Sequence, residues 1–316
     1  MEGNNTLIFC LYAAGLALSG LLYAYCLGRQ GNKRLCALSG MILGLPLAYA
    51  GAKLFFLLKH MGLDIGSWTA ETVFSAAWEE FSFAGGCIGF TLGIWTAAKI
   101  LRIPGGKALD LFAVPGCILI AFARMAEAGM VNIGQGNLPA FLPEAFPFAV
   151  KDDWGDAFLA VFTLEALAAL LCAVWLILSG RKRKDRFSGR FRKAVVVLCS
   201  AQLFLEMLVT NYWITFIISF IHMDQVLCAA ALLATVIRGS VRNKKAGPAI
   251  VAVLLIGLNA LTQYIQDKPY LVSLPDSVDV SALALSVFAL CSAGLIAAGL
   301  RAVREDHSQL TSSKGS

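Results

Sequence analysis

Charged residues are scarce in this chain. Only 15% of the 316 residues are Asp, Glu, Lys or Arg, whereas soluble globular domains carry about 25%. Histidine is rarer still, with 3 residues, and none of the 9 cysteines forms a CxxC pair or has a histidine at ligand spacing. The composition excludes an ordinary soluble globular protein, and we expect neither a metal site nor a cofactor. The cysteines lie mostly inside apolar runs and are expected to be small core residues.

Long hydrophobic runs take the place of the missing charge, since 58% of the residues are hydrophobic. Runs of about 18 residues or more are long enough to cross a bilayer as a helix. Lipid offers no hydrogen bonds to the backbone, so each run must pair its own amides. We therefore predict an all-α, polytopic transmembrane helical bundle with about nine spans. The expected spans are 7–27, 35–58, 84–101, 109–127, 157–179, 194–216, one that ends at 238, 248–266 and 280–300.

The basic residues predict the orientation of the bundle. They collect in alternate turns, and the strongest cluster runs from Arg181 to Lys193. Basic turns favour the cytoplasmic side, which predicts an outside amino terminus and a cytoplasmic carboxyl terminus. We interpret the cluster as a topology anchor, and binding of anionic lipid or of a partner is the alternative. The net charge of +6 is explained by these turns, so no nucleic-acid partner is expected.

Five ionisable residues fall inside the expected spans, and with this orientation all lie in the outer half of the membrane. Charges at such depth are rare, and they mark a functional site by default. Two are basic and three acidic, so they could be pairs that only hold the bundle together. They could also form a site for an anionic phospholipid head group, with bases for phosphate and acids or amides for hydroxyls. These residues are Lys53, Arg124, Glu127, Glu165 and Glu206.

The stretch from Trp78 to Asn137 holds a distinctive series of residues in two apolar segments around a basic turn. In order, they are Gly85, Gly86, Asp110, Leu111, Ala113, Pro115 and Arg124. This series resembles the core of bacterial prolipoprotein diacylglyceryl transferases, which have an H-G-G turn, a helix, a basic turn, an L-D-L-x-A-P helix start and then G-R-x-G-N-F-x-N-x-E. Here the family's histidine is replaced by Ala84, and its later glutamate falls near Asn132.

Four further segments resemble the family's motifs in the same order. The family's G-x-R-L-G-Y is similar to 51–56, with Lys53 for the arginine, and L-Y-E-A-L is similar to 163–167 around Glu165. R-F-x-x-E is similar to 202–206, with Gln202 for the arginine and Glu206 retained. M-G-Q is similar to 223–225. The resemblance covers residues 8 to 238, so we expect a seven-helix core at 1–238 followed by two additional helices and a polar tail at 239–316.

The resemblance implies an activity at the outer face of a bacterial cytoplasmic membrane. Family members transfer the diacylglyceryl group of phosphatidylglycerol to the lipobox cysteine of a prolipoprotein, and glycerol phosphate leaves. The partners would be phosphatidylglycerol, a prolipoprotein signal peptide and membrane lipids. The chemistry needs a thiolate, positive charge at the phosphate and closely held substrates.

By this resemblance Arg124, Glu165 and Glu206 are the expected catalytic residues, and Arg124 would clamp the phosphate. The general base stays open. Glu165 and Glu127 would tune the site or accept a proton, and His222 or His60 could substitute for the missing histidine. The alternative for both histidines is an interfacial residue without a catalytic role.

The alternative to a transferase is a non-catalytic relative that binds or presents outer-leaflet anionic phospholipid. A third hypothesis is a transporter or an enzyme with another acceptor. We expect Lys53, Arg124, Glu165 and Glu206 to face one cavity. The expected substrate-binding residues are Lys53, Glu127, Gly85, Gly86, Gln202 and Asn132.

Overall fold

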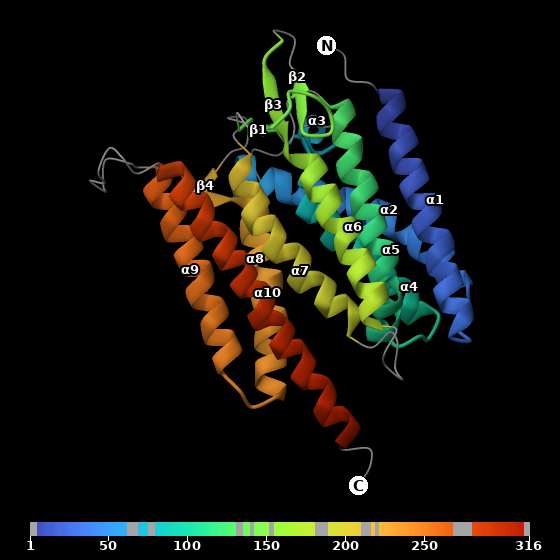
Figure 1. Cartoon of the computed structure of the whole chain (residues 1–316). Coiled ribbons are helices and arrows are strands. Elements are labelled where there is room, and N and C mark those ends of the chain that lie inside the picture. The colour runs from blue at the N-terminus through green and yellow to red at the C-terminus, as the bar shows by residue number, and fades with distance from the viewer. Residues whose placement is uncertain are drawn as a thin grey trace. The chain divides into compact units, whose positions relative to one another are not determined.

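The computed structural model describes residues 5–61, 69–74, 80–130, 135–139, 142–151, 155–180, 189–209, 216–218, 221–267 and 280–312. Helices dominate these residues (Figure 1). The helices are α1 Asn5–Arg29, α2 Leu35–Met61, α3 Ala70–Phe74, α4 Phe83–Ile100, α5 Gly105–Ala126, α6 Val161–Gly180, α7 Arg190–Leu205, α8 Met223–Arg242, α9 Gly247–Asp267 and α10 Val280–Ser312. Two 3₁₀ turns, η3 Glu127–Gly129 and η4 Glu206–Leu208, follow α5 and α7.

Eight helices in the described part of the chain are long and apolar enough to cross a membrane. This confirms the expected all-α polytopic membrane bundle. The orientation of its termini stays a prediction.

The expected span at 194–216 is wrong in its bounds. The helix there, α7, has 16 residues and ends at Leu205, and Phe216 begins strand β4, Phe216–Ile218. Sixteen residues rise about 24 Å, less than the roughly 30 Å of a hydrocarbon core. The described strand residues Phe216, Ile217 and Ile218 are β-branched or aromatic, types that favour extended backbone over helix. The apolar run was long enough to suggest a span, but the residue types at its end do not favour a helix.

The chain divides into two compact units, and each is described by itself. The first comprises Met1–Ala194 and Leu208–Thr215, and the second comprises Val195–Met207 and Phe216–Ser316. The sequence-based division at 238 marked the extent of the family resemblance and stays a prediction.

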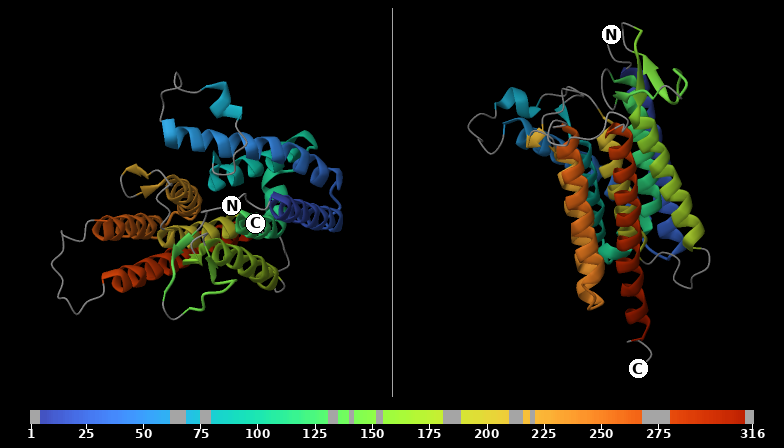
Figure 2. Two further views of the ribbon diagram at one scale, coloured as in Figure 1. Left: turned by 90° about the horizontal axis from the view of Figure 1, so that it is seen from above. Right: turned by 60° about the vertical axis from the view of Figure 1, so that its left-hand side comes forward.

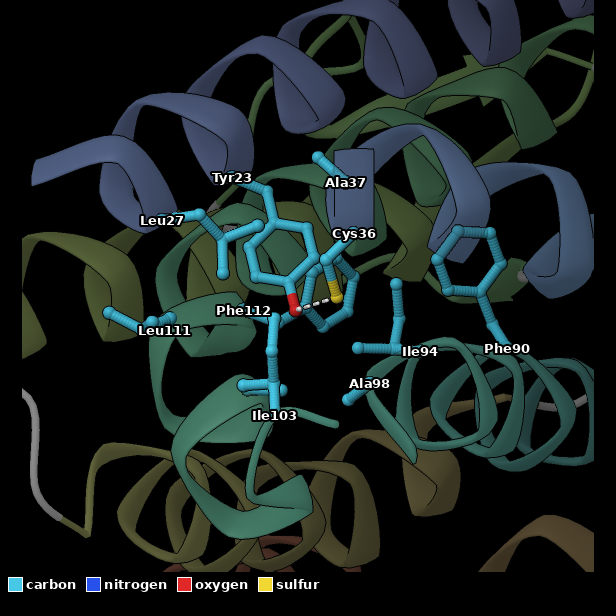
Figure 3. Packing of buried hydrophobic residues seen from close by; sticks show 11 residues of the cluster. Tyr23, Leu27, Cys36, Ala37, Phe90, Ile94, Ala98, Ile103, Leu111 and Phe112 are labelled. Atoms are coloured by element: carbon cyan, nitrogen blue, oxygen red, sulfur yellow. Dashed lines mark hydrogen bonds between the residues drawn. The ribbon is translucent and has the colours of Figure 1, made fainter. Parts of the chain in front are cut away.

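In the first unit the helices pack in two sets. α1 lies beside α5 and α5 beside α6, while α2 and α4 pack along each other (Figures 1 and 2). Figure 3 shows the core where these helices meet: Tyr23 and Phe112 pack edge to face at 5.3 Å between ring centroids, and the Tyr23 hydroxyl lies 3.8 Å from Cys36 Sγ. A buried phenol needs a polar partner, and the thiol provides one.

A small sheet occupies part of the connection between α5 and α6. Strand β3, Ala157–Ala160, lies between β1, Gln135–Asn137, and β2, Ala149–Lys151, and both pairings are antiparallel. The Thr163 hydroxyl, in the first turn of α6, donates to Pro147 O and Ala160 O at 2.7 Å. The sheet therefore fixes the start of α6, two residues ahead of Glu165.

The second unit is built from α8, α9, α10 and most of α7. α9 and α10 lie side by side along much of their length (Figures 1 and 2). Small residues on α10 allow close packing, since a Cβ on Gly294 would lie 2.7 Å from Leu255 Cδ1 on α9 and one on Gly299 would lie 2.5 Å from Val196 Cγ1 on α7. The buried core of this unit comprises Val196, Leu203, Leu232, Val236, Ala252, Leu295, Ala302 and Val303.

Candidate functional site

Arg124 lies in the last turn of α5, where a cation is favoured by the helix dipole. Its Nη1 donates to Glu127 Oε1 at 2.6 Å, and Glu127 begins the 3₁₀ turn that follows the helix. Both side chains are at least nine-tenths buried. The spacing of three residues, with the chain still helical, brings the two groups to the same face.

A second carboxylate reaches Arg124 from α6. Glu165 Oε2 lies 2.9 Å from Arg124 Nε, and the Glu165 side chain is 5% exposed. The guanidinium also stacks on Phe83, with 3.6 Å from Cζ to the ring centroid. Arg124 is therefore held by two carboxylates and one aromatic face, which come from η3, α6 and α4.

Two residues that the sequence analysis did not single out join this cluster. The Tyr12 hydroxyl on α1 interacts electrostatically with Glu127, Arg124 and Cys87. Tyr12 and Cys87 look like ordinary members of apolar runs in the sequence. No spacing signal connects residue 12 to residue 124, so only the packing of α1 on α5 reveals the contact.

Lys53 forms a separate cluster on α2. Its Nζ donates to Glu80 Oε2 at 2.6 Å and lies 5.4 Å from the ring centre of Phe56 and 5.3 Å from that of Phe81. The Lys53 side chain is buried, whereas Glu80 is about one-third exposed. The sequence analysis expected Lys53 to be a site residue but assigned no role to Glu80.

The two clusters lie on either side of the start of α4. Ser82 caps this helix, since its hydroxyl accepts a hydrogen bond from Gly85 N and its own amide donates to Ala52 O on α2. Phe81, just before the cap, contacts the Lys53 ammonium, and Phe83, just after it, contacts the Arg124 guanidinium. A short segment thus places one aromatic face on each buried cation.

Gly85 and Gly86 have different surroundings. A Cβ on Gly85 would lie 2.6 Å from Gly51 O, so this glycine lets the backbones of α2 and α4 touch. A Cβ on Gly86 would meet Ala52 Cβ at 3.6 Å, which is an ordinary contact. The role of both residues in substrate binding stays a prediction, and Gly85 has a clear packing role.

Glu206 and Gln202 belong to the second unit. Glu206 Oε1 lies 2.9 Å from His222 Nδ1, and its Oε2 accepts a hydrogen bond of 2.9 Å from Gln202 Nε2. His222 begins the cap of α8, where its backbone amide donates to Gln225 Oε1 at 3.0 Å. The structure thus brings Arg124 together with Glu165, while Glu206 has its own partners. The single cavity shared with Lys53 stays a prediction.

Asn132 lies outside the described residues, as do residues 181–188 of the basic cluster. The side chain of His60 is likewise outside them. Their expected roles remain predictions.

The three charged groups described at this site do not balance one another. One guanidinium contacts two carboxylates, so these three groups together carry one negative charge unless a carboxyl group holds a proton. An anion that binds Arg124 must therefore compete with a carboxylate already in contact with it. A proton delivered to either carboxylate would weaken that competition.

No protein-family model matches the sequence, and no curated protein matches it. The residues and their geometry therefore carry the functional argument.

Proposed function

We propose that the chain is a bacterial membrane enzyme that transfers the diacylglyceryl group of phosphatidylglycerol to the lipobox cysteine of a prolipoprotein. The observation that carries this proposal is the buried Arg124 with Glu127 and Glu165 in direct contact. A phosphate-binding cation and a proton acceptor are the two groups that the reaction needs. Both are present at one point in the first unit, within expected membrane spans.

Arg124 binds the phosphate of the lipid. Its planar guanidinium can donate two parallel hydrogen bonds, and it is positioned by the ring of Phe83. Lys53, on the other side of the Ser82 cap, supports the negative charge of the head group. The diacyl chains remain among the lipid-facing helices.

Glu165 or Glu127 accepts the proton of the acceptor thiol, because the thiolate is the nucleophile. The sulfur forms a bond to the glycerol carbon, and the bond from that carbon to the phosphate oxygen breaks. The electron pair leaves with the oxygen, so the departing glycerol phosphate gains one negative charge. The same proton transfer neutralises a carboxylate on Arg124, which frees guanidinium hydrogen bonds for the phosphate as its charge increases.

A second candidate is a non-catalytic relative that binds or presents outer-leaflet anionic phospholipid. It is favoured by Ala84 at the family's histidine position and by Gln202 at an arginine position, where an uncharged amide donates to Glu206. In this case Arg124 binds the head group and no bond is broken.

One assay separates the two functions. The purified protein in lipid nanodiscs receives labelled phosphatidylglycerol and a lipobox peptide, and both bound lipid and modified peptide are measured. The transferase predicts labelled peptide, whereas the binding protein predicts bound lipid with no labelled peptide. Absence of both outcomes contradicts both functions.

Three variants test the roles. We expect Arg124→Ala to abolish lipid binding and transfer, and Arg124→Lys to weaken both because the fork is lost. Glu165→Gln should reduce transfer while binding is kept or strengthened, because a competing charge is removed. Glu144→Gln is the matched control, since this carboxylate is exposed and its ion pair with Lys151 Nζ is long, at 3.9 Å. The proposal fails if Arg124→Ala leaves lipid binding unchanged.

A further inference from the structure

Among the described residues of the second unit, five serine or asparagine side chains are buried and have a polar atom without a visible partner. Two of them, Ser240 and Asn243, lie at the end of α8, and the other three lie on α7, α9 and α10. Ser200 on α7, Asn259 on α9 and Ser292 on α10 are 0%, 4% and 7% exposed. In the part of the chain that the structure describes, Ser200 Oγ, Asn259 Nδ2 and Ser292 Oγ have no hydrogen-bond partner. A buried polar group in this state costs free energy, and the cost falls if a group outside these residues, such as ordered water, satisfies it.

Other hydroxyls of the same unit show that this state is not general. Thr235, Thr262 and Ser286 each donate to a carbonyl of their own helix at 2.8 Å. These residues are partly buried or exposed. The helix therefore satisfies hydroxyls at its periphery, whereas the hydroxyls of Ser200 and Ser292 are directed elsewhere.

Helix register places the three residues at similar depth. Leu255 faces Gly294, and α9 and α10 are antiparallel neighbours. Asn259 lies four residues beyond Leu255, or about 6 Å along the axis. Ser292 lies two residues from Gly294 in the same direction, or about 3 Å. Asn259 and Ser292 therefore differ in depth by only about 3 Å.

The depth of Ser200 on α7 follows in the same way, because Val196 on α7 faces Gly299 on α10. Ser200 lies one turn from Val196 on the same face, about 6 Å along the axis, and Ser292 lies two turns from Gly299, about 10 Å. The two hydroxyls are thus separated by about 4 Å in depth. All three groups are buried in one unit, within a layer about 8 Å deep.

The Glu206–His222 pair lies in this layer too. Glu206 is ten residues beyond Val196, about 15 Å along the axis, and so about 5 Å in depth from Ser292. Glu206 and His222 are 7% and 4% exposed. The carboxylate holds the imidazole through Nδ1 and accepts from Gln202. Titratable residues near the pair are Asp224, Cys199 and Cys228, with Tyr264 on α9 and Cys291 on α10 at similar depth.

We propose that this layer is a hydrated binding site, in which ordered water joins Ser200, Asn259 and Ser292 to the Glu206–His222 pair. Water fits the chemistry because it donates and accepts, so it satisfies both a hydroxyl and an amide N–H. The donor set is largely uncharged, which suits a neutral ligand. Such water gives the buried imidazole, at the start of α8, a route to exchange its proton. The site lies in the second unit and is independent of the transferase chemistry assigned to Arg124.

Solid-state NMR on the full chain in lipid bilayers tests the proposal. The protein has 3 histidines, His60, His222 and His307, so His60→Asn with His307→Asn leaves His222 as the only imidazole. The measurement follows the transfer of proton polarisation from water to the ¹⁵N-labelled His222 ring. We expect rapid transfer although the side chain is buried. A ring that receives no polarisation from water would overturn the proposal.

Asn259→Leu in this background should remove most of the transfer, because the amide that holds the water is gone. The matched control is Thr262→Val on the same helix, whose hydroxyl is bonded to Leu258 O, and it should leave the transfer unchanged. If Asn259→Leu does not fold, Ser292→Ala is measured in its place, since it removes a single oxygen. Unchanged polarisation transfer in the variant that is measured rules out water held by these residues.

Discussion

The two units differ in how their buried polar groups are satisfied. In the first unit the buried charged groups contact opposite charges and aromatic rings, as at Arg124 and Lys53. In the second unit a carboxylate and an imidazole accompany neutral hydroxyl and amide groups. The first interior is suited to hold an ion, whereas the second is suited to hold water.

The units also differ in how closely their helices approach. In the first unit a Cβ on Gly89 would collide with Leu47 O, so α2 and α4 touch through their backbones. In the second unit Gly294 and Gly299 face the side chains of Leu255 and Val196, although Gly239 on α8 faces the backbone of Ala302. Side chains can move aside more easily than backbone carbonyls. The α2–α4 contact should therefore tolerate a larger residue less well than the contacts of Gly294 and Gly299.

The largest loss of stability should come from removing the cation at Arg124. Arg124→Ala leaves Glu127 and Glu165 as buried neighbouring carboxylates, and the free energy of unfolding should fall by about 3 to 5 kcal/mol. Thermal unfolding in detergent measures it.

The triple variant Arg124→Met, Glu127→Gln and Glu165→Gln is the control, because it removes all three charges. It should recover most of the stability but no function. A triple variant as unstable as Arg124→Ala would show that packing, and not charge, explains the loss.

The next effect should come from the α2–α4 contact. Gly89→Ala must push the two backbones apart, and we expect a loss of about 1 to 3 kcal/mol, as for other overpacked interiors. The control is Gly257→Ala on α9, where a Cβ meets nothing within 4 Å. That change should be neutral or stabilising, because alanine favours helix. Chemical unfolding of both variants gives the comparison, and equal losses would contradict the distinction between the units.

Residue types and apolar run length were enough to predict the membrane bundle and the Arg124–Glu127 neighbourhood. They failed at α7, because run length alone does not separate a helix from the β-branched and aromatic segment after Leu205. The charged residues were identified as unusual from their setting in apolar runs. Their partners were less predictable: Glu80, Tyr12 and Phe83 meet the buried cations only through contacts between distant helices.

A smaller effect is expected at Lys53. Lys53→Met removes the cation, but Glu80 is 32% exposed and can turn toward water. The loss should be about 1 kcal/mol, well below that at Arg124, because the remaining carboxylate is not trapped. Thermal unfolding compares the two single variants directly. A loss as large as that of Arg124→Ala would mean that Glu80 cannot reach solvent.

The smallest loss of stability is expected at the helix caps. One of these caps is charged and the other is neutral. Asp110 accepts hydrogen bonds from Gly189 N and Phe191 N at 2.8 and 2.9 Å and so caps the start of α7 with a carboxylate. The cap of α8 is neutral, with Gln225 Oε1 on the His222 amide. Asp110→Ala should lower the free energy of unfolding by about 1 kcal/mol. Gln225→Ala should lower it less, because a charged acceptor makes the stronger hydrogen bond and complements the helix dipole. Chemical unfolding of both variants resolves the order, and a larger loss for Gln225→Ala would show that the second unit depends on its neutral hydrogen bonds more than the first depends on this charge.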